Sequence, residues 1–463
     1  MQKKAISRKA RSAPRPAAVD APVLLADHAH ARHVLPCGLT VVLVEQPHLH
    51  RATLSAFVGA GSRYETAADN GLAHFLEHML FRGTARFPTS HALNLAVERL
   101  GGTLEAATAP DSTELTVTLP APSLDAGVEV LADVLSRPRL DDIEVERRVI
   151  AEEIREDLGE DGRPIDIDLL TRRRVWPDHA LGQSVTGPLE NVLRFGVADL
   201  RRLLEARYVG PNAVFCAAGR FEPARLLDAI ERAFAQLPAG PLPAPSPAPR
   251  PGAGPTAYHR HKPGSQTQLR LAFAAPGEDD ADAPALAMLD RLIDDGMAAP
   301  LHRRVFEELG LAYSVGAGLE WYPDAGAYQV DASCAHENVP ELVGEILATL
   351  ADVRDRAVAG ELATGELARA RERAVWDLES WQDRPQAMAV WYGEQELFRR
   401  PRSLAAEAAA IRAVSPADVG RVAARVLAPE NLHATTVGAL GARERARVER
   451  AVTRWGRAPG AAR

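Results

Sequence analysis

Hydrophobic residues recur along the first half of the chain with the two periods that distinguish strands from helices. Apolar runs and alternation predict strands at 34–45, with a hairpin turn at Cys37–Gly38, at 53–58 and at 103–119, where Pro110–Asp111 interrupts the strand. Apolar positions three and four residues apart predict helices at 70–83, 91–100, 124–135, 142–158 and 223–236. This mixture of elements predicts a protein of the α+β class.

The second half repeats this order of elements. Its strands are predicted at 267–273 and 328–333, and its helices at 283–293, 339–357 and 364–381. The helix at 283–293 takes the place of the helix at 70–83, so we infer a degenerate internal duplication. Between the halves, residues 237–256 contain eight prolines among Gly and Ala, which predicts a semi-extended linker.

Composition adds a basic tail to this outline. Residues 1–19 carry six basic residues and no acidic one, a composition that predicts disorder. The 463 residues therefore divide into a basic tail (1–21), a first domain (22–236), the linker (237–256), a second domain (257–456) and a short tail (457–463). The net charge of the whole chain is −8, which gives no electrostatic case for a nucleic-acid partner.

Cysteine usage and hydropathy bear on the compartment. The three cysteines, Cys37, Cys216 and Cys334, lie far apart, which suits a reducing compartment without disulfides. No apolar stretch has the length of a membrane span, so no spanning segment is predicted. We expect a bacterial cytoplasmic protein, and the Arg-, Ser- and Ala-containing tail leaves the mitochondrial matrix open as an alternative.

The predicted helix at 70–83 carries the pattern H-x-x-E-H at His74, Glu77 and His78. Asp69 or Asn70 is expected to cap its start, and Gly83 to end it. Residues four apart leave the same side of a helix, so both imidazoles can bind one Zn²⁺ while Glu77 takes a proton from a water molecule. This order of residues marks the inverzincin peptidases. The alternative is a plain helix with two surface histidines.

A third ligand is available on the helix predicted at 142–158. A catalytic zinc site needs three protein ligands and an open position. Glu153 would complete a set of two histidines and one glutamate, and Glu146, two helical turns earlier, would place a second carboxylate near it. The alternative is a solvated, glutamate-rich face. The histidines of the second half lack ligand spacing and are expected at the surface: His259, His261, His302, His336 and His433.

These segments resemble a known family. HFLEHMLFRGT at 74–84, preceded by VGAGSRYE at 58–65 and followed by ERRVIAEEI at 146–154, is similar to the pitrilysin and mitochondrial-processing-peptidase family, in its short two-domain subclass. The resemblance implies that His74, His78 and Glu153 bind one Zn²⁺ per chain. It implies that Glu77 is the catalytic base and Glu146 an accessory catalytic carboxylate. It also implies two homologous α/β-sandwich domains, each a mostly antiparallel sheet with helices packed on it.

The resemblance also implies a substrate-binding strand. In the family, the strand after the double glycine lies at a sheet edge near the metal and pairs with the substrate backbone. In this chain the strand comprises Leu104, Glu105, Ala106, Ala107 and Thr108. The alternative is an ordinary strand with polar residues at its edges.

A segment of the second half departs from the family pattern. Active relatives carry an arginine and, seven residues later, a tyrosine that bind the substrate carbonyl. Tyr313 matches the tyrosine, but Phe306 stands where the arginine is expected, with Arg303 and Arg304 nearby. The resemblance implies that two chains close one chamber, either as a homodimer or as a heterodimer with a homologue that supplies the arginine–tyrosine pair. The alternative is that Tyr313 only packs in a strand.

The expected function is therefore that of a zinc-dependent endopeptidase that hydrolyses short or unfolded peptides. One alternative is a subunit of a heterodimer that processes leader or targeting peptides. Another is a non-catalytic structural subunit of the same fold, which Phe306 favours and the intact H-x-x-E-H motif opposes.

Overall fold

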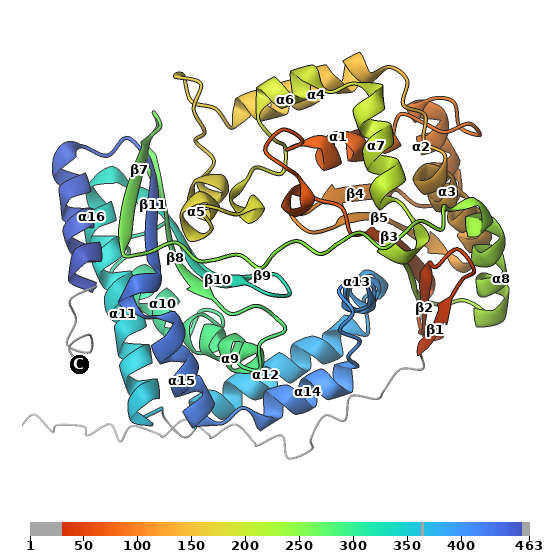
Figure 1. Cartoon of the computed structure of the whole chain (residues 1–463). Coiled ribbons are helices and arrows are strands. Elements are labelled where there is room, and N and C mark those ends of the chain that lie inside the picture. Colours follow the sequence, from red (N-terminus) through yellow and green to blue (C-terminus); the bar gives the residue numbers. More distant parts are fainter. Residues whose placement is uncertain (1–29, 363–364, 456–463) are drawn as a thin grey trace, which may run out of the picture.

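The computed structural model describes residues 30–362 and 365–455, so the predicted tails at 1–21 and 457–463 lie outside the described residues. The described chain forms two sheets, one on each side of the molecule, with helices packed on both (Figure 1). The first sheet is built from residues 30–219 and the second from residues 256–438. The expected fold class, two α/β-sandwich domains with mostly antiparallel sheets, is confirmed.

The first sheet has the strand order β1-β2-β6-β3-β5-β4, and only β2 and β6 are parallel neighbours. The predicted turn at Cys37–Gly38 joins β1 to β2, and the interruption at Pro110–Asp111 is the turn between β4 and β5. β4 therefore forms one edge of this sheet. The strands are β1 (His30–Val34), β2 (Thr40–Glu45), β3 (Arg51–Val58), β4 (Leu104–Thr108), β5 (Thr113–Pro120) and β6 (Ala213–Gly219).

The second sheet repeats this topology without the first strand. Its order is β7-β11-β8-β10-β9, again with a single parallel pair, β7 and β11. β7 thus corresponds to β2, β11 to β6 and β9 to the edge strand β4. The strands are β7 (Thr256–His261), β8 (Gln266–Ala275), β9 (Ser314–Trp321), β10 (Gly326–Ala335) and β11 (Leu432–Gly438).

The helices follow the same succession in both halves, which supports the inferred duplication. The first half has α1 (Leu72–Leu80), α2 (Ser90–Arg99), α3 (Leu124–Ser136), α4 (Ile143–Glu156), α5 (Ile167–Val175), α6 (Leu189–Arg194), α7 (Val197–Arg207) and α8 (Pro223–Ala233). The second half has α9 (Ala283–Ile293), α10 (Pro300–His302), α11 (Val339–Ala359), α12 (Glu366–Trp381), α13 (Pro385–Leu397), α14 (Leu404–Ala413), α15 (Pro416–Val426) and α16 (Ala442–Trp455). No described helix combines the length and the apolar composition that a bilayer crossing needs.

The two halves exchange one helix each. α13 packs on β3 and β6 of the first sheet, and α5 packs on β8 and β11 of the second. Figure 1 shows α13, coloured blue, beside the red strands, and α5, coloured yellow, beside the green and blue strands. Gly393 of α13 allows this approach, because a Cβ there would lie 2.1 Å from the Phe57 ring. One hydrophobic core therefore joins Phe57 and Cys216 of the first sheet to the second half.

The structure contradicts one surface prediction. His433 lies near the start of the buried strand β11, and only 1% of the residue is exposed. Its Nδ1 lies 2.9 Å from the Thr256 hydroxyl, and burial lowers its pKa to about 4. A histidine can be buried when its ring stays neutral and one nitrogen is hydrogen-bonded. The spacing of histidines along the sequence does not show whether these conditions are met.

The exchanged helix α13 carries a carboxyl group whose ionisation opposes folding. Burial, followed by the charges of Glu114, Glu278 and Asp111, raises the pKa of Glu394 to about 7. A carboxyl with a raised pKa in the folded state binds its proton more tightly there than in the unfolded chain. Stability is therefore lost as the pH rises from the unfolded pKa through the folded one.

We predict that Glu394→Gln raises the free energy of unfolding by about 1–3 kcal/mol at pH 8 and by less than about 1 kcal/mol at pH 5. Urea unfolding at both pH values measures the difference. The exposed Glu205 provides the matched control, and Glu205→Gln should change neither value. Equal effects of Glu394→Gln at pH 5 and pH 8 would show that its carboxyl titrates normally.

Candidate metal centre

Helix α1 presents His74, Glu77 and His78 beside the edge strand β4. Its apolar face, which includes Phe75 and Met79, is buried in the core of the first domain. The imidazole rings of His74 and His78 have their centroids 4.7 Å apart. The local period of the sequence therefore suffices to bring these two side chains together.

Helix α4 supplies the third donor. Ile150 and Ile154 are buried against the first-domain core, and this packing turns Glu153 toward α1. The Nε2 atom of His74 lies 3.6 Å from one Glu153 oxygen, and Nε2 of His78 lies 3.7 Å from the other. Donor atoms of the three residues lie within 4.8 Å of one another. Two imidazoles and one carboxylate in such a cluster fit a Zn²⁺ ion with a fourth position left open.

Glu146 lies behind His78. Its carboxylate is 3.1 Å from His78 Nδ1, on the side of the ring opposite to Nε2, and 3.3 Å from an Arg82 nitrogen. A carboxylate at Nδ1 fixes the tautomer and orientation of an imidazole whose Nε2 binds a metal. The hydrogen bond to His78 lowers the pKa of Glu146. Burial opposes charging of His78, but Glu146 and the neighbouring carboxylates outweigh it and raise the pKa of the ring.

His74 has different surroundings. It is 8% exposed, and burial together with the charge of His78 lowers its pKa to about 4. The ring is therefore neutral at pH 7, which is the form that binds a metal. Its Nδ1 atom is buried and has no hydrogen-bond partner among the described residues. Of the two histidines, His78 is thus the one that a carboxylate orients.

Glu77 faces β4. The hydroxyl of Thr108, the last residue of β4, donates a hydrogen bond of 3.0 Å to the Glu77 carboxylate. Burial raises the pKa of Glu77, which strengthens it as a proton acceptor. Leu104 and Ala106 face the core of the first domain, whereas Glu105 and Ala107 are exposed. The predicted substrate strand therefore ends beside the predicted base.

The start of α1 is capped by a residue that sequence reasoning missed. The expected caps, Asp69 and Asn70, do not perform this role, because the cap position is Gly71 at φ 97°. The free N–H groups of Gly71 and Ala73 donate to the buried carboxylate of Glu65, at 2.8 and 2.6 Å. Burial raises the pKa of Glu65. A carboxylate at a helix N-terminus is stabilised by the helix dipole, but Glu65 lies outside the spacing of a capping box.

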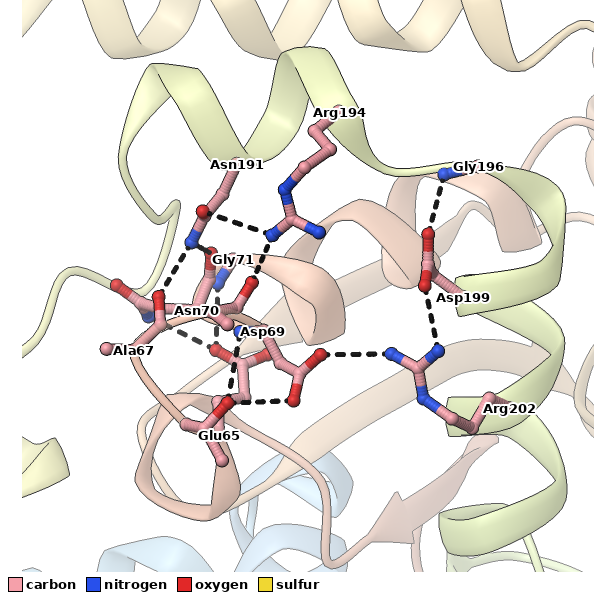
Figure 2. Close-up of polar contacts among 12 residues, drawn as sticks. Glu65, Ala67, Asp69, Asn70, Gly71, Asn191, Arg194, Gly196, Asp199 and Arg202 are labelled. Carbon is pink, nitrogen blue, oxygen red and sulfur yellow. Dashed lines mark hydrogen bonds and ion pairs between the residues drawn. The ribbon is translucent and has the colours of Figure 1, made fainter.

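A polar network holds this cap from the side of α6. Figure 2 shows Asn191 donating to the carbonyls of Ala67 and Asn70, and Arg194 beside Asn191. Asn70 in turn donates to Glu65 at 3.1 Å. The first turn of α6 thus packs against the start of the helix that carries both histidines. α1 itself ends at Leu80, before the predicted stop at Gly83.

The candidate site residues of the second half lie on elements of the second domain. Tyr313 precedes β9, the edge of the second sheet, and is 83% exposed. Phe306 is 42% exposed and stacks on His302, with ring centroids 4.8 Å apart. Arg304 is bound to Glu308 and Glu345, so it does not replace the expected arginine as an unengaged cation.

We predict that Glu65→Gln destabilises the fold by about 1–3 kcal/mol, because an amide cannot accept hydrogen bonds at both of its ends. Chemical unfolding of the metal-free chain measures this loss. Asp69→Asn is the matched control, since Asp69 contacts Thr66 and Arg202 at the surface, and it should cost less than about 0.5 kcal/mol. A larger loss for Asp69→Asn than for Glu65→Gln would contradict the assignment of the cap.

Several known proteins are similar to this chain in sequence or in fold. The chain is 36% identical over 208 residues to the beta subunit of the mitochondrial-processing peptidase of Blastocladiella emersonii, a match that covers 44% of each protein. It is 32% identical over 331 residues to an uncharacterized zinc protease of Mycobacterium tuberculosis, covering 70% of this chain and 73% of the relative. A protease from Helicobacter pylori has the same fold, with a TM-score of 0.80 at 21% identity over 89% of this chain and 100% of that chain.

Two family models match consecutive parts of the sequence. The model described as insulinase, peptidase family M16, matches residues 40–188, which contain the candidate metal centre. The model described as the peptidase M16 inactive domain matches residues 194–372. The resemblance read from the sequence is thus confirmed, and the chain belongs to peptidase family M16.

Proposed function

We propose that this protein is a zinc-dependent endopeptidase that hydrolyses short or unfolded peptides. The observation that carries the proposal is the cluster of His74, His78 and Glu153 donor atoms within 4.8 Å, with Glu77 on the same helix as the histidines. Relatives named zinc proteases support the metal. We propose one Zn²⁺ per chain, because the described residues contain a single such cluster.

Each residue of the cluster has a distinct proposed role. When bound, the ion supplies Lewis acidity that activates a water molecule and polarises a peptide carbonyl. His74, His78 and Glu153 hold the ion, and Glu146 orients His78 through its Nδ1. Glu77 accepts the proton of the attacking water and delivers it to the leaving amine, a role that its raised pKa favours. Thr108 holds the Glu77 carboxylate in place.

We propose that the substrate binds as an added strand on β4. Within the described residues β4 pairs only with β5, so its other edge is free to bind an extended backbone. The residues of this strand are Leu104, Glu105, Ala106, Ala107 and Thr108. Main-chain pairing accepts many sequences provided that they are extended, so folded proteins are excluded and unfolded segments are accepted.

The domain roles follow the duplication. We propose that residues 22–236 form the catalytic domain, that 237–256 is the linker, and that 257–456 is a degenerate copy. Helix α9 of the copy corresponds to α1 but lacks the H-x-x-E-H motif. This division is supported by the separate sheets and by the family models, although the second model begins at residue 194, before the linker.

We propose that the complete chamber needs a second chain. Tyr313 is 83% exposed on the second domain, where a second chain could receive it. The partner is either a second copy or a homologue with the arginine–tyrosine pair. The similarity to a processing-peptidase subunit supports the related proposal that this chain removes leader or targeting peptides inside a heterodimer. The intact donor set argues against a purely structural subunit.

The proposed compartment rests on the relatives. We propose the bacterial cytoplasm, because zinc proteases that are similar over the greater part of the chain come from bacteria. The three cysteines are free, which suits a reducing environment.

The central test separates metal binding from chemistry. Glu77→Gln should retain zinc and lower the hydrolysis of a quenched, unstructured peptide by about 10²–10⁴-fold, because only the proton acceptor is lost. Glu153→Gln should lose zinc and hydrolysis together. Elemental analysis and peptide cleavage on the same samples measure both quantities. Full activity of Glu77→Gln, or unchanged zinc in Glu153→Gln, would remove the residue from its proposed role.

A mixing experiment tests the second chain. Tyr313→Phe should lower kcat/KM by about 10²-fold, as expected for loss of one hydrogen-bond donor to the developing oxyanion. In a homodimer that donates Tyr313 across its interface, a mixture of Glu77→Gln and Tyr313→Phe chains regains activity, because mixed dimers contain one complete site. Absence of recovery, with both variants still dimeric by light scattering, would contradict donation between two copies.

A further inference from the structure

The proposed zinc ligand Glu153 lies three residues before the end of α4, and the chain beyond α4 is bound to the second domain. Residues 157–166 connect α4 to the exchanged helix α5. Backbone bonds close this connection into a compact loop, with Ile165 N donating to Asp157 O and Gly159 N to Arg163 O, both at 2.8 Å. In Figure 1 the yellow segment after α4 descends to α5, which lies against the second sheet.

Arg260 of β7 forms hydrogen bonds with this loop. Its Nε donates to the carbonyl of Pro164 at 3.0 Å, and one terminal nitrogen donates to an Asp161 oxygen at 2.9 Å. The other terminal nitrogen donates to the second Asp161 oxygen and, at 3.1 Å, to the carbonyl of Arg163. The Arg260 side chain is only 11% exposed. All three guanidinium nitrogens are therefore used on one loop, in the bidentate geometry that makes arginine pairs specific.

Helix α5, which begins directly after the loop, is held by further contacts. Asp168 at the start of α5 is paired with Arg270 of β8. Near the end of α5, the Arg174 guanidinium lies 3.3 Å from the centre of the Tyr258 ring of β7. Because both ends of α5 are bound to the second sheet, the loop and α5 are fixed to the second domain.

Glu153 itself has few constraints. Its side chain is 43% exposed, and within the described residues the side chains that its carboxylate approaches are the His74 and His78 rings, at 3.6 and 3.7 Å. Its position is therefore set by the backbone of the last turn of α4. Helix ends fray unless the chain beyond them is held, so the anchoring of residues 157–166 determines how well the carboxylate is placed.

The duplication provides an internal comparison. In the second half, α12 and α13 are joined by residues 382–384, three residues in place of the ten at 157–166. There, the side chain of Gln46, which follows β2, donates a hydrogen bond of 2.6 Å to the carbonyl of Gln382. α12 carries no proposed ligand. The longer loop and its arginine occur in the half whose helix carries Glu153.

We propose that Arg260 is a positioning residue of the metal centre, through which the second domain holds Glu153 in place. This inference rests on the proposed function, because it requires Glu153 to bind the metal. The second, degenerate domain then contributes to metal binding without supplying a ligand. Binding linkage is reciprocal, so zinc should in turn stabilise the loop at 157–166.

The test is the zinc affinity of the full-length chain, measured by competition with a chromophoric chelator. Arg260→Gln should raise the Kd for zinc about tenfold, the lower end of the range for groups that bond a metal ligand directly, because Arg260 acts through the loop. The Kd of Arg260→Lys should lie between that of the natural chain and that of Arg260→Gln, because an ammonium can reach Asp161 without bonding both carbonyls. The double variant Asp161→Asn/Arg260→Gln should raise the Kd by less than the product of the two single-variant factors, since the two residues act as one pair.

Arg32→Gln is the matched control. Arg32 of β1 also bridges the two halves, through an ion pair of 2.9 Å to Glu396 of α13, but β1 lies at the opposite edge of the first sheet from β4. This variant should bind zinc like the natural chain. If Arg32→Gln weakens zinc as much as Arg260→Gln, the effect is general loosening of the domains and the inference fails.

Hydrogen exchange provides a second readout. In the natural chain zinc should slow the exchange of the Gly159 and Ile165 amides, and in Arg260→Gln it should not. Zinc binding by the natural chain with an unchanged Kd in Arg260→Gln would overturn the inference and leave the proposed function intact. A natural chain that binds no zinc would overturn the proposed function itself.

Discussion

The contact between α1 and α4 is the constraint on which the candidate centre depends. α1 supplies two imidazoles at a spacing that any helix gives, but the third donor comes from another helix, and its carboxylate is 43% exposed. The burial of Ile150 and Ile154 against the first-domain core brings Glu153 to within 3.6–3.7 Å of both rings. A metal tolerates only small errors in such a set, so the packing of two helices becomes a condition for the chemistry.

Burial and hydrogen bonds shift the pKa values of the ionisable groups of the site in different directions. It keeps the His74 ring neutral, with a pKa of about 4, and raises the pKa of Glu77, whereas the bond to His78 keeps Glu146 anionic. Glu65 is buried as well, and its position at the N-terminus of α1 is stabilised by the N–H groups of Gly71 and Ala73. The carboxylates of Glu65, Glu77 and Glu146 therefore differ in pKa shift or in hydrogen-bond partners because their surroundings differ.

The two halves are joined by helices that pack on each other's sheets. Each half places one helix on the sheet of the other, α5 on the second sheet and α13 on the first, so each sheet is partly covered by a helix of the other half. The elements around α4 depend on this exchange, because the chain passes from Glu153 through the loop held by Arg260 into α5. The second domain thus contacts the chain that directly follows α4.

The sequence by itself determined what local periodicity controls: the helix with His74, Glu77 and His78, and an order of elements that recurs in both halves. The edge position of the strand at 104–108 was implied by the family resemblance and is present in the first sheet. It suggested Glu153 and Glu146 by spacing, but their distances to the histidines depend on helix packing. Only the tertiary structure decided that Glu65, and not Asp69 or Asn70, caps α1, that His433 is buried, and that Arg260 binds the loop at 157–166. These contacts join residues far apart in sequence or outside any local motif. Their partners are selected by burial and hydrogen-bond satisfaction, which no short-range pattern encodes.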